Sequence, residues 1–311
     1  MSQKIAMIFP GQGSQTIGMG KSFYENSALA REMFDKAGER IGVDFTKLLF
    51  EENEQINETA YTQPAILLIS IIAYTLFQES KPTDATLFLG HSLGELSALC
   101  AAGAIDYVDA VELVHKRGML MQKACEGVSA GMMVILGMDD SAVEEVCATA
   151  QANGKRVWPA NYNQTGQLVV AGIKEDLQAM ESVFKEAGAK RAMLLNMSIA
   201  SHCPLLSSAM EPLGNAMENV VSDTFSAPIV SNASMQKYST KKEAIEWLKV
   251  QLIQPVKYKQ SIESIMGEVD RMIEFGNGSV LKGLNKKIAP DIETLNVSDM
   301  ETLAKVCEAL S

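Results

Sequence analysis

A serine close to two glycines is the residue of this chain best suited to nucleophilic chemistry. Ser92 lies at the centre of the pentapeptide 90–94, which reads GHSLG, follows the apolar run 85–89 and opens a helix predicted over 93–102. A strand, a sharp turn and a helix in this order form a nucleophile elbow, in which the helix directs backbone N–H groups at an oxyanion. Ser92 is therefore the candidate catalytic nucleophile. On this pattern alone, an ordinary glycine-rich turn is the alternative.

The candidate base is one of three histidines. A serine hydroxyl is a weak nucleophile at neutral pH and needs a base within hydrogen-bond reach. His91 is adjacent to the serine and His115 falls within a predicted helix, so we interpret both as structural or exposed. His202 follows a strand-like segment at the junction of two predicted units, where clefts form, and is the candidate base. A histidine that is only solvated in a polar turn is the alternative.

The segment 10–15, which reads PGQGSQ, is a second candidate part of the site. It follows the β-type run 4–9, but its glycines lack the G-x-G-x-x-G spacing of a dinucleotide-binding loop. A turn at the carboxyl end of a strand in a parallel sheet lies on the edge where sites assemble. Its amides and the Gln12 side chain are therefore candidates for an oxyanion hole. A plain surface turn is the alternative.

The elements around these segments alternate between strands and helices. Apolar periodicity predicts helix from the turn to about residue 39, over 62–80 and over 107–124. This alternation favours an α/β fold class with a parallel sheet. We expect a large catalytic α/β-hydrolase-like domain, formed by residues 1–127 and 198–311. Its second part is expected to contain a helix at 204–217, a strand at 228–231, a helix at 241–252 and a strand at 272–275.

The segment 128–197 differs from the rest of the chain in the order of its predicted strands and helices. It is predicted to be an inserted small ferredoxin-like domain. Its elements follow the order β-α-β-β-α-β, which is that of the ferredoxin-like unit. The strands are expected at 132–136, 156–160, 167–171 and 190–195, and the helices at 141–152 and 174–187.

The composition is that of a water-soluble enzyme and limits the classes of partner. The 311 residues are 47% hydrophobic, and the net charge of −11 argues against nucleic acid, whose phosphates need clustered Lys and Arg. The longest apolar stretch, 64–77, is shorter than the roughly 20 residues that span a bilayer, and the start does not resemble a signal peptide. We therefore expect a cytoplasmic protein without a membrane partner. The five cysteines are expected to be free thiols, including Cys203 beside His202, and no metal site is predicted.

Motifs along nearly the whole chain together resemble those of the malonyl-CoA:acyl carrier protein transacylases, the acyltransferases of fatty acid and polyketide synthesis. They occur in the order of that family. They are FPGQGSQ at 9–15, TQPA at 62–65, GHSLGE at 90–95, RG at 117–118, NYN and GQ at 161–163 and 166–167, SH at 201–202, QL and PV at 251–252 and 255–256, and GNG at 276–278 before Leu281.

The resemblance implies a ping-pong reaction with a covalent malonyl-serine intermediate. Ser92 would take the malonyl group from malonyl-CoA and pass it to the phosphopantetheine thiol of acyl carrier protein, for type II fatty acid synthesis. His202 would move the proton. No bound cofactor is implied, and we expect a monomer. Malonyl transfer to a polyketide carrier protein is an alternative.

The resemblance also assigns roles to four further residues. The backbone N–H groups of Gln12 and Leu93 would form the oxyanion hole, and the backbone carbonyl of Gln251 would orient the imidazole. Arg117 would pair with the free carboxylate of malonate and disfavour acetyl-CoA as donor. Outside this context, we would interpret an arginine in a helix as a solvated surface residue.

Two other classes of protein share parts of this pattern. A serine esterase or thioesterase of the α/β-hydrolase type uses the same elbow, but its histidine comes near the end of the chain, whereas 109 residues follow His202 (311 − 202). A non-catalytic carrier-docking subunit would have no need of Ser92, His202 and Arg117 together.

Two departures from the family pattern concern selectivity and a turn. The segment 199–202 lacks the phenylalanine that many malonyl-selective relatives carry before the histidine, which leaves tolerance of methylmalonyl open. Asn277 replaces the common proline of a Gly-Pro-Gly turn, where we expect only a local backbone effect, because asparagine tolerates left-handed turn geometry.

The carrier protein partner is usually acidic, so docking on this acidic chain would need a local basic patch. Scattered solubilising charges are the alternative for each candidate residue. The candidates are Lys116, Lys123, Lys155, Arg156, Lys190 and Arg191.

Overall fold

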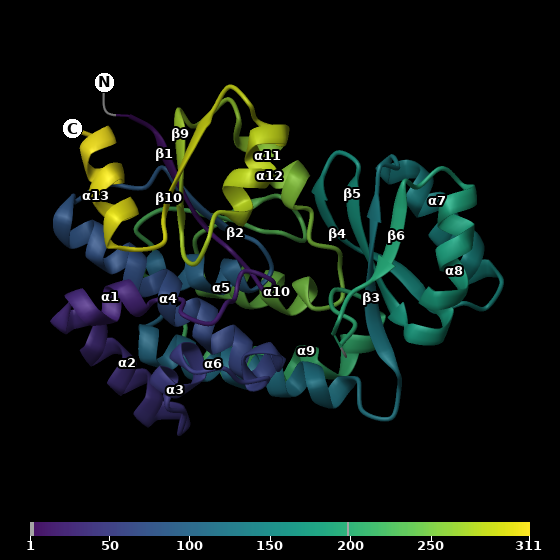
Figure 1. The fold of residues 1–311 in the computed structure, drawn as a ribbon, viewed down its shortest axis with the longest axis horizontal. Coiled ribbons are helices and arrows are strands. Elements are labelled where there is room, and N and C mark those ends of the chain that lie inside the picture. The colour runs from purple at the N-terminus through teal and green to yellow at the C-terminus, as the bar shows by residue number, and fades with distance from the viewer. Residues whose placement is uncertain (1–2, 198) are drawn as a thin grey trace.

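The computed structural model describes residues 3–197 and 199–311, which form two units with different kinds of sheet (Figure 1). The larger unit contains a six-stranded, mainly parallel sheet in the order β10-β9-β1-β2-β7-β8. The smaller unit contains a four-stranded antiparallel sheet in the order β4-β5-β3-β6. The predicted α/β class is confirmed. Residue 1 and the boundary predicted at residue 198 lie outside the described residues.

The strand β1 (Ile5–Phe9) lies inside the large sheet and is buried on both faces. Met7 and Phe9 pack in one apolar cluster, whereas Ala6 and Ile8 pack in another. Because successive side chains of a strand point to opposite faces, helices must cover both sides of the sheet. Figure 1 shows α4, α5 and α6 on one side and α11 and α12 on the other.

The neighbours of β1 bring the two turns predicted for the site together. β1 pairs in parallel with β2 (Leu87–Gly90), and in this register Phe9 lies opposite Gly90. Both strands therefore end at the same place on the same edge of the sheet. The turn at 10–15 follows one strand and Ser92 follows the other, so the fold places these two segments next to each other.

The remaining strands of the large sheet extend it on either side. β9 (Arg271–Phe275), β10 (Glu293–Val297) and β7 (Ile229–Val230) are parallel to their neighbours, and β8 (Lys237–Tyr238) is antiparallel to β7. The helices of this unit are α1 (Lys21–Asn26), α2 (Ala28–Ile41), α3 (Phe45–Phe50), α4 (Thr59–Ser80), α5 (Leu93–Ala101), α6 (Tyr107–Ala124), α9 (Met210–Glu218), α10 (Lys241–Gln251), α11 (Tyr258–Ile265), α12 (Val280–Ile288) and α13 (Met300–Ala309), with short 3₁₀ turns at Gln55–Asn57 and Pro204–Ala209.

The helix α4 contains the long apolar stretch of the sequence. It is long and apolar enough to cross a membrane by composition, but 83% of its apolar window is buried inside this protein. It packs closely against α6 and the sheet. The stretch is therefore the core helix that the sequence predicts.

The small unit follows the predicted order of elements. These are β3 (Ala130–Leu136), α7 (Asp140–Ala152), β4 (Val157–Gln164), β5 (Gln167–Ile173), α8 (Lys174–Glu186) and β6 (Arg191–Leu194). Met133 and Ile135 of β3 pack with the two helices, whereas Met132 belongs to the apolar cluster of the large unit. One face of the small sheet is thus turned toward the large unit. The Tyr162 N–H also donates to the Val256 carbonyl of the large unit at 2.9 Å.

Candidate active site

The turn that carries Ser92 has the strained backbone of a nucleophile elbow. Ser92 lies between β2 and α5 with a φ of 54°, in a region that side-chain-bearing residues rarely occupy. A Cβ atom on Gly90 would lie 1.9 Å from the Gly94 carbonyl carbon, and one on Gly94 would lie 2.0 Å from the Phe9 carbonyl oxygen. Only glycine fits at either position, as the sequence pattern indicates.

His202 and Gln251 complete a hydrogen-bonded chain that begins at Ser92. The Ser92 Oγ lies 2.7 Å from His202 Nε2, and His202 Nδ1 lies 2.7 Å from the backbone oxygen of Gln251. A carbonyl only accepts, so Nδ1 carries the proton and Nε2 is free to accept the serine hydroxyl proton. The structure therefore brings together the three residues that the sequence singled out for nucleophile, base and imidazole orientation.

The electrostatic environment keeps the His202 imidazole neutral at pH 7. The residue is 2% exposed, and this burial lowers the pKa of His202 to about 3. The positive charge of Arg117 contributes to this lowering, whereas the hydrogen bond to Gln251 opposes it. A neutral imidazole in contact with a serine hydroxyl is the state that a general base requires.

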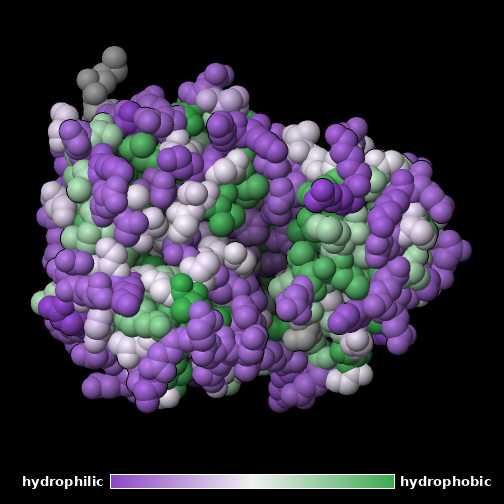
Figure 2. Space-filling model, viewed as in Figure 1, coloured by the Kyte–Doolittle hydropathy of each residue, from purple (hydrophilic) through white to green (hydrophobic). Residues whose placement is uncertain are grey.

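Ser92 opens into a cavity of about 400 Å³ between the two units. Figure 2 shows the hollow between them, with apolar surface on the side of the small unit. The lining includes Gln12, Ser92, Leu93 and His202 from the large unit. The small unit contributes the apolar side chains of Met132, Val134 and Val169.

Gln12 and Leu93 lie beside Ser92 on the two neighbouring turns. The Gln12 side chain donates from Nε2 to Thr59 Oγ1 at 3.1 Å, which ties the turn at 10–15 to the start of α4. Leu93 is the first residue of α5, and the first N–H groups of a helix have no partner within it. Both residues line the cavity, as an oxyanion hole requires.

Arg117 is 1% exposed, so it is not the solvated surface residue that a helical arginine outside the family context would be. Its Nη1 donates to Gln63 Oε1 at 2.8 Å and its Nη2 donates to Gln251 Oε1 at 3.1 Å. Its Nε finds no hydrogen-bond partner among the residues that the structure describes. Gln63 lines the cavity, so the guanidinium that donates to it lies directly behind the cavity wall. Its Nε–H is left to donate to another group.

Asn232, Glu95 and Gln63, to which sequence reasoning assigned no role, form hydrogen bonds that hold the site residues in place. Asn232 Oδ1 accepts the Ser92 N–H at 2.7 Å, and its Nδ2 donates to the Gly90 carbonyl at 2.7 Å, which fixes the elbow on both sides of the nucleophile. Gln251 Nε2 donates to the Ser92 carbonyl at 3.0 Å and to Glu95 Oε2 at 2.8 Å. Glu95 and Gln63 belong to the motifs GHSLGE and TQPA, but Asn232 lies in no motif that could have identified it.

The expectation that Asn277 has only a local backbone effect is wrong. The positive φ angles of this turn occur at the flanking Gly276 and Gly278, at 141° and 75°. The Asn277 side chain instead donates from Nδ2 to the Ser14 carbonyl at 2.6 Å and to Thr16 Oγ1 at 3.0 Å. The residue therefore ties the end of β9 to the turn that contains Gln12.

The other histidines and cysteines have structural surroundings. His91 Nε2 contacts Asn163 Oδ1 of the small unit at 2.8 Å, and His115 Nδ1 donates to the Ala60 carbonyl at 2.7 Å. Cys203 is fully buried, and the described cysteines are all unpaired. Within the described residues, no three His, Cys, Asp or Glu side chains gather as metal ligands.

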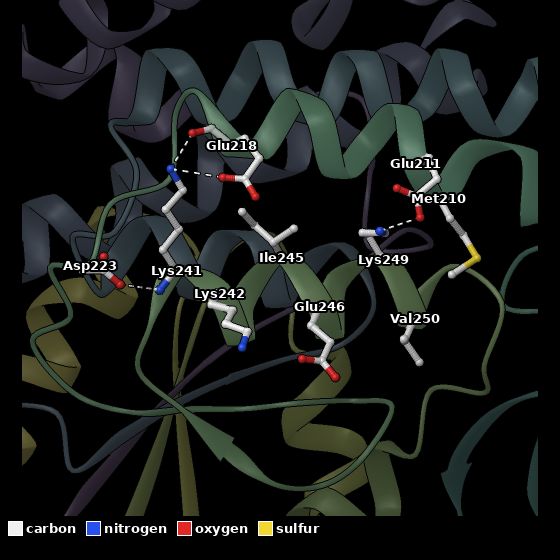
Figure 3. Close-up of a pocket in the computed structure, with 10 residues that line it drawn as sticks. All are labelled: Met210, Glu211, Glu218, Asp223, Lys241, Lys242, Ile245, Glu246, Lys249 and Val250. Atoms are coloured by element: carbon white, nitrogen blue, oxygen red, sulfur yellow. Dashed lines mark hydrogen bonds and ion pairs between the residues drawn. The ribbon is translucent and has the colours of Figure 1, made fainter.

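A second hollow, of about 490 Å³, lies between α9 and α10 and differs in chemistry (Figure 3). Lys249 pairs with Glu211 at 2.5 Å and Lys241 pairs with Glu218 at 3.3 Å across it. The described residues that line it include neither serine, cysteine nor histidine. Two of its lysines are already paired and its described lining offers no such nucleophile or base, so the cavity at Ser92 is the candidate active site.

Comparisons with known proteins show what the chain is similar to. The family model described as "Acyl transferase domain" matches residues 6–287. The chain is 40% identical over 309 residues to the malonyl CoA-acyl carrier protein transacylase of Bacillus subtilis, which covers 99% of this chain and 97% of that protein. It is similar to the malonyl-CoA:acyl carrier protein transacylase structure from Helicobacter pylori, with 46% identity, a TM-score of 0.96 and 99% of each chain covered. It is also similar to a malonyl-transacylase solved in complex with a type II polyketide synthase acyl carrier protein, with 35% identity, a TM-score of 0.93, and 98% of this chain and 99% of that chain covered.

Proposed function

The chain belongs to the acyl transferase domain family and, within it, to the malonyl-CoA:acyl carrier protein transacylases, and from this premise we propose how its own residues carry out the transfer. The protein is an acyltransferase that moves the malonyl group of malonyl-CoA to acyl carrier protein in fatty acid synthesis. A relative solved with a polyketide carrier protein makes that class of carrier the alternative recipient.

In the proposed reaction, Ser92 and His202 act twice. Ser92 Oγ attacks the thioester carbonyl while His202 Nε2 takes the hydroxyl proton, and the carbon–sulfur bond breaks as the proton passes to the sulfur of coenzyme A. The phosphopantetheine thiol of the carrier then attacks the malonyl-serine ester, with His202 moving its proton to Ser92. The 2.7 Å contact between Ser92 Oγ and the neutral His202 imidazole is the observation that carries this proposal.

We assign the oxyanion hole to residues that line this cavity and the carboxylate site to Arg117, which lies behind Gln63 of its wall. The backbone N–H groups of Gln12 and Leu93 would stabilise the tetrahedral oxyanion, a contribution of roughly 3 to 4 kcal/mol for one donor. The Arg117 guanidinium would bind the free carboxylate of malonate. Its burial and its unpartnered Nε support this role, since an acetyl group would leave this buried donor without an acceptor. No resident cofactor takes part, because the phosphopantetheine arrives on the carrier.

We further infer the domain organisation and the state of the protein. The small unit, 128–197, would be a ferredoxin-like insertion in an α/β-hydrolase-like domain formed by 1–127 and 198–311. The strand order β4-β5-β3-β6 supports the first inference, since the first and third strands of the unit lie at its centre, and the elbow after β2 supports the second. We propose a cytoplasmic monomer without nucleic acid or membrane partners.

The basic patch that would bind the carrier is a proposal. Fewer of its candidate residues are free of ion pairs within the protein than the sequence suggests. Lys116 lies 3.4 Å from Glu112, and Lys155 lies 3.1 Å from Asp176, so two of the six candidates are paired within the protein. Charge reversal at the true patch should raise KM for the carrier and leave malonyl-CoA hydrolysis unchanged. Unchanged carrier kinetics would reject the assignment.

The proposed mechanism is tested by intact-protein mass after mixing with malonyl-CoA, acetyl-CoA or methylmalonyl-CoA. We expect one malonyl adduct on the wild type, none on Ser92→Ala, and discharge of the adduct when holo carrier protein is added. The methylmalonyl sample measures tolerance of a branch. Loss of the adduct only to water would favour the serine esterase or thioesterase, and the absence of any adduct would favour a non-catalytic subunit.

A further inference from the structure

Glu95 is a buried carboxylate on α5, one helical turn after Ser92. Its side chain has no exposed surface, and three donors surround it. Its Oε2 accepts from the Asn232 N–H at 2.9 Å and from Gln251 Nε2 at 2.8 Å, and its Oε1 accepts from the Tyr238 hydroxyl at 3.1 Å. These contacts keep Glu95 away from the reacting atoms, so any part it has in the reaction acts through a neighbour.

The neighbour is Arg117, which Glu95 reaches through Gln251. The Gln251 amide donates to Glu95 from Nε2 and accepts from Arg117 Nη2 at its Oε1. The direct partners of the guanidinium, Gln63 and Gln251, are both neutral. A buried cation with only neutral partners is costly, so a nearby anion must balance it. The attraction between the two charges favours the ionised form of each residue.

Binding of a carboxylated substrate would add a second negative charge beside Arg117. A malonyl carboxylate on Arg117 would place two anions beside one buried cation, and like charges this close cannot both remain ionised without penalty. Among the described residues that contact Glu95, Tyr238 is the only other titratable group, and burial raises its pKa well above the ordinary value. Asn232 and Gln251 are neutral. Burial raises the pKa of Glu95 to about 7, so this carboxyl is the group that protonates most easily near neutrality.

We propose that Glu95 is the resident counter-charge of Arg117 and takes up one proton from solvent when a substrate carboxylate binds the guanidinium. The proton is released again when the malonyl group leaves on the carrier. Glu95 is thus a positioning residue that sets the affinity of the site for a carboxylated acyl donor and makes this affinity depend on pH. The inference rests on the proposed role of Arg117.

The test measures proton uptake by calorimetric titration of malonyl-CoA in two buffers of different ionisation enthalpy. Ser92→Ala protein allows binding without acyl transfer, and free coenzyme A controls for the titration of its own phosphates. At pH 7.5 a carboxyl with a pKa of about 7 is about three-quarters ionised, so Ser92→Ala should take up about 0.75 proton. Ser92→Ala/Glu95→Gln, which keeps the side-chain shape, should take up none.

The same proteins give a second readout in the dissociation constant. Between pH 6.5 and 8.5 the Kd of Ser92→Ala for malonyl-CoA should rise by about 25-fold, if Glu95 is protonated throughout in the complex, whereas the Glu95→Gln form should show no such rise. Tyr238→Phe removes a hydrogen bond that favours the carboxylate, so it should raise the pKa of Glu95 and reduce the proton uptake. This variant keeps the test available if Glu95→Gln does not fold.

The outcomes separate the inference from its premise. Equal proton uptake with and without Glu95, or no uptake by Ser92→Ala, would overturn the counter-charge role. Ser92→Ala/Arg117→Ala should bind malonyl-CoA no more tightly than coenzyme A. If it binds malonyl-CoA as tightly as before, the carboxylate role of Arg117 fails, whatever the Glu95 variants show.

Discussion

The pH dependence of Ser92 acylation provides a direct test of the proposed base. A histidine with an ordinary pKa of about 6.5 loses its basic form as the pH falls below neutrality. Burial lowers the pKa of His202 to about 3, and the nearby Arg117 cation acts in the same direction. His202 should therefore stay neutral, and able to accept a proton from Ser92, throughout the range in which ordinary histidines become charged.

The two values of the His202 pKa predict very different acylation rates at low pH. At pH 5.5, a histidine with a pKa of about 6.5 is only about one-tenth neutral, so a rate that depends on it falls roughly 10-fold from its plateau. With a pKa of about 3, more than about 99% of His202 is still neutral at that pH, and the acylation rate should change by less than about 1.5-fold.

The assay is single-turnover formation of malonyl-enzyme between pH 5.5 and 8, quenched and read by intact-protein mass. Saturating malonyl-CoA removes the pH dependence of binding that we ascribe to Glu95. Far-ultraviolet circular dichroism at each pH confirms that the protein is folded. A 10-fold fall in the rate with a midpoint near pH 6.5 would refute the neutral, desolvated state of His202 that the geometry supports.

Two substitutions test the turns that position the reacting groups. Gly94→Ala would place a Cβ atom 2.0 Å from the Phe9 carbonyl oxygen, so we expect it to lower the free energy of unfolding by at least about 2 kcal/mol and to abolish acylation. Gly283→Ala is the matched control, because its Cβ atom meets nothing within 4 Å, and it should stabilise α12 by about 0.5 to 1 kcal/mol in chemical denaturation. Asn277→Ala removes both hydrogen bonds to the turn at Gln12, and we expect roughly a fivefold lower kcat, equivalent to about 1 kcal/mol, with an unchanged KM for malonyl-CoA. Asn219→Ala loses only an exposed bond to the Asn215 carbonyl and should leave kcat at the wild-type value. Equal kcat values for the two asparagine variants would contradict the link between Asn277 and the oxyanion turn.

The parts of the site that could be predicted from the sequence are those encoded by local sterics. The glycines around Ser92 are needed by the turn itself, whatever the rest of the fold does, so GHSLG indicated the elbow correctly. His202 could be selected because few histidines were available and the domain pattern placed it at a junction. Arg117 could be selected only through the family resemblance, because nothing local distinguishes a buried helical arginine from an exposed one.

The parts that could not be predicted depend on contacts between distant segments. Asn232 contacts Ser92 and Gly90 because β7 pairs with β2, and no residue spacing in the sequence predicts that these two strands pair. The same holds for Asn277, whose side chain contacts a turn more than 260 residues earlier in the chain. Among the elements, β8, β10 and the helices α3, α11, α12 and α13 were not predicted, although β10 completes the edge of the large sheet.

The neutral partner of His202 is explained by the charge of the proposed substrate. A carboxylate in the place of the Gln251 carbonyl would hold the imidazole equally well, but it would add an anion beside the cation that must bind malonate. Gln251 avoids this conflict, because its backbone oxygen accepts from His202 while its side chain contacts Arg117 and the Ser92 carbonyl. With Glu95 as the resident counter-charge, a malonyl carboxylate replaces one anion beside Arg117 by another. An acetyl donor offers no carboxylate to exchange for Glu95 at this cation, so discrimination against it should appear in binding.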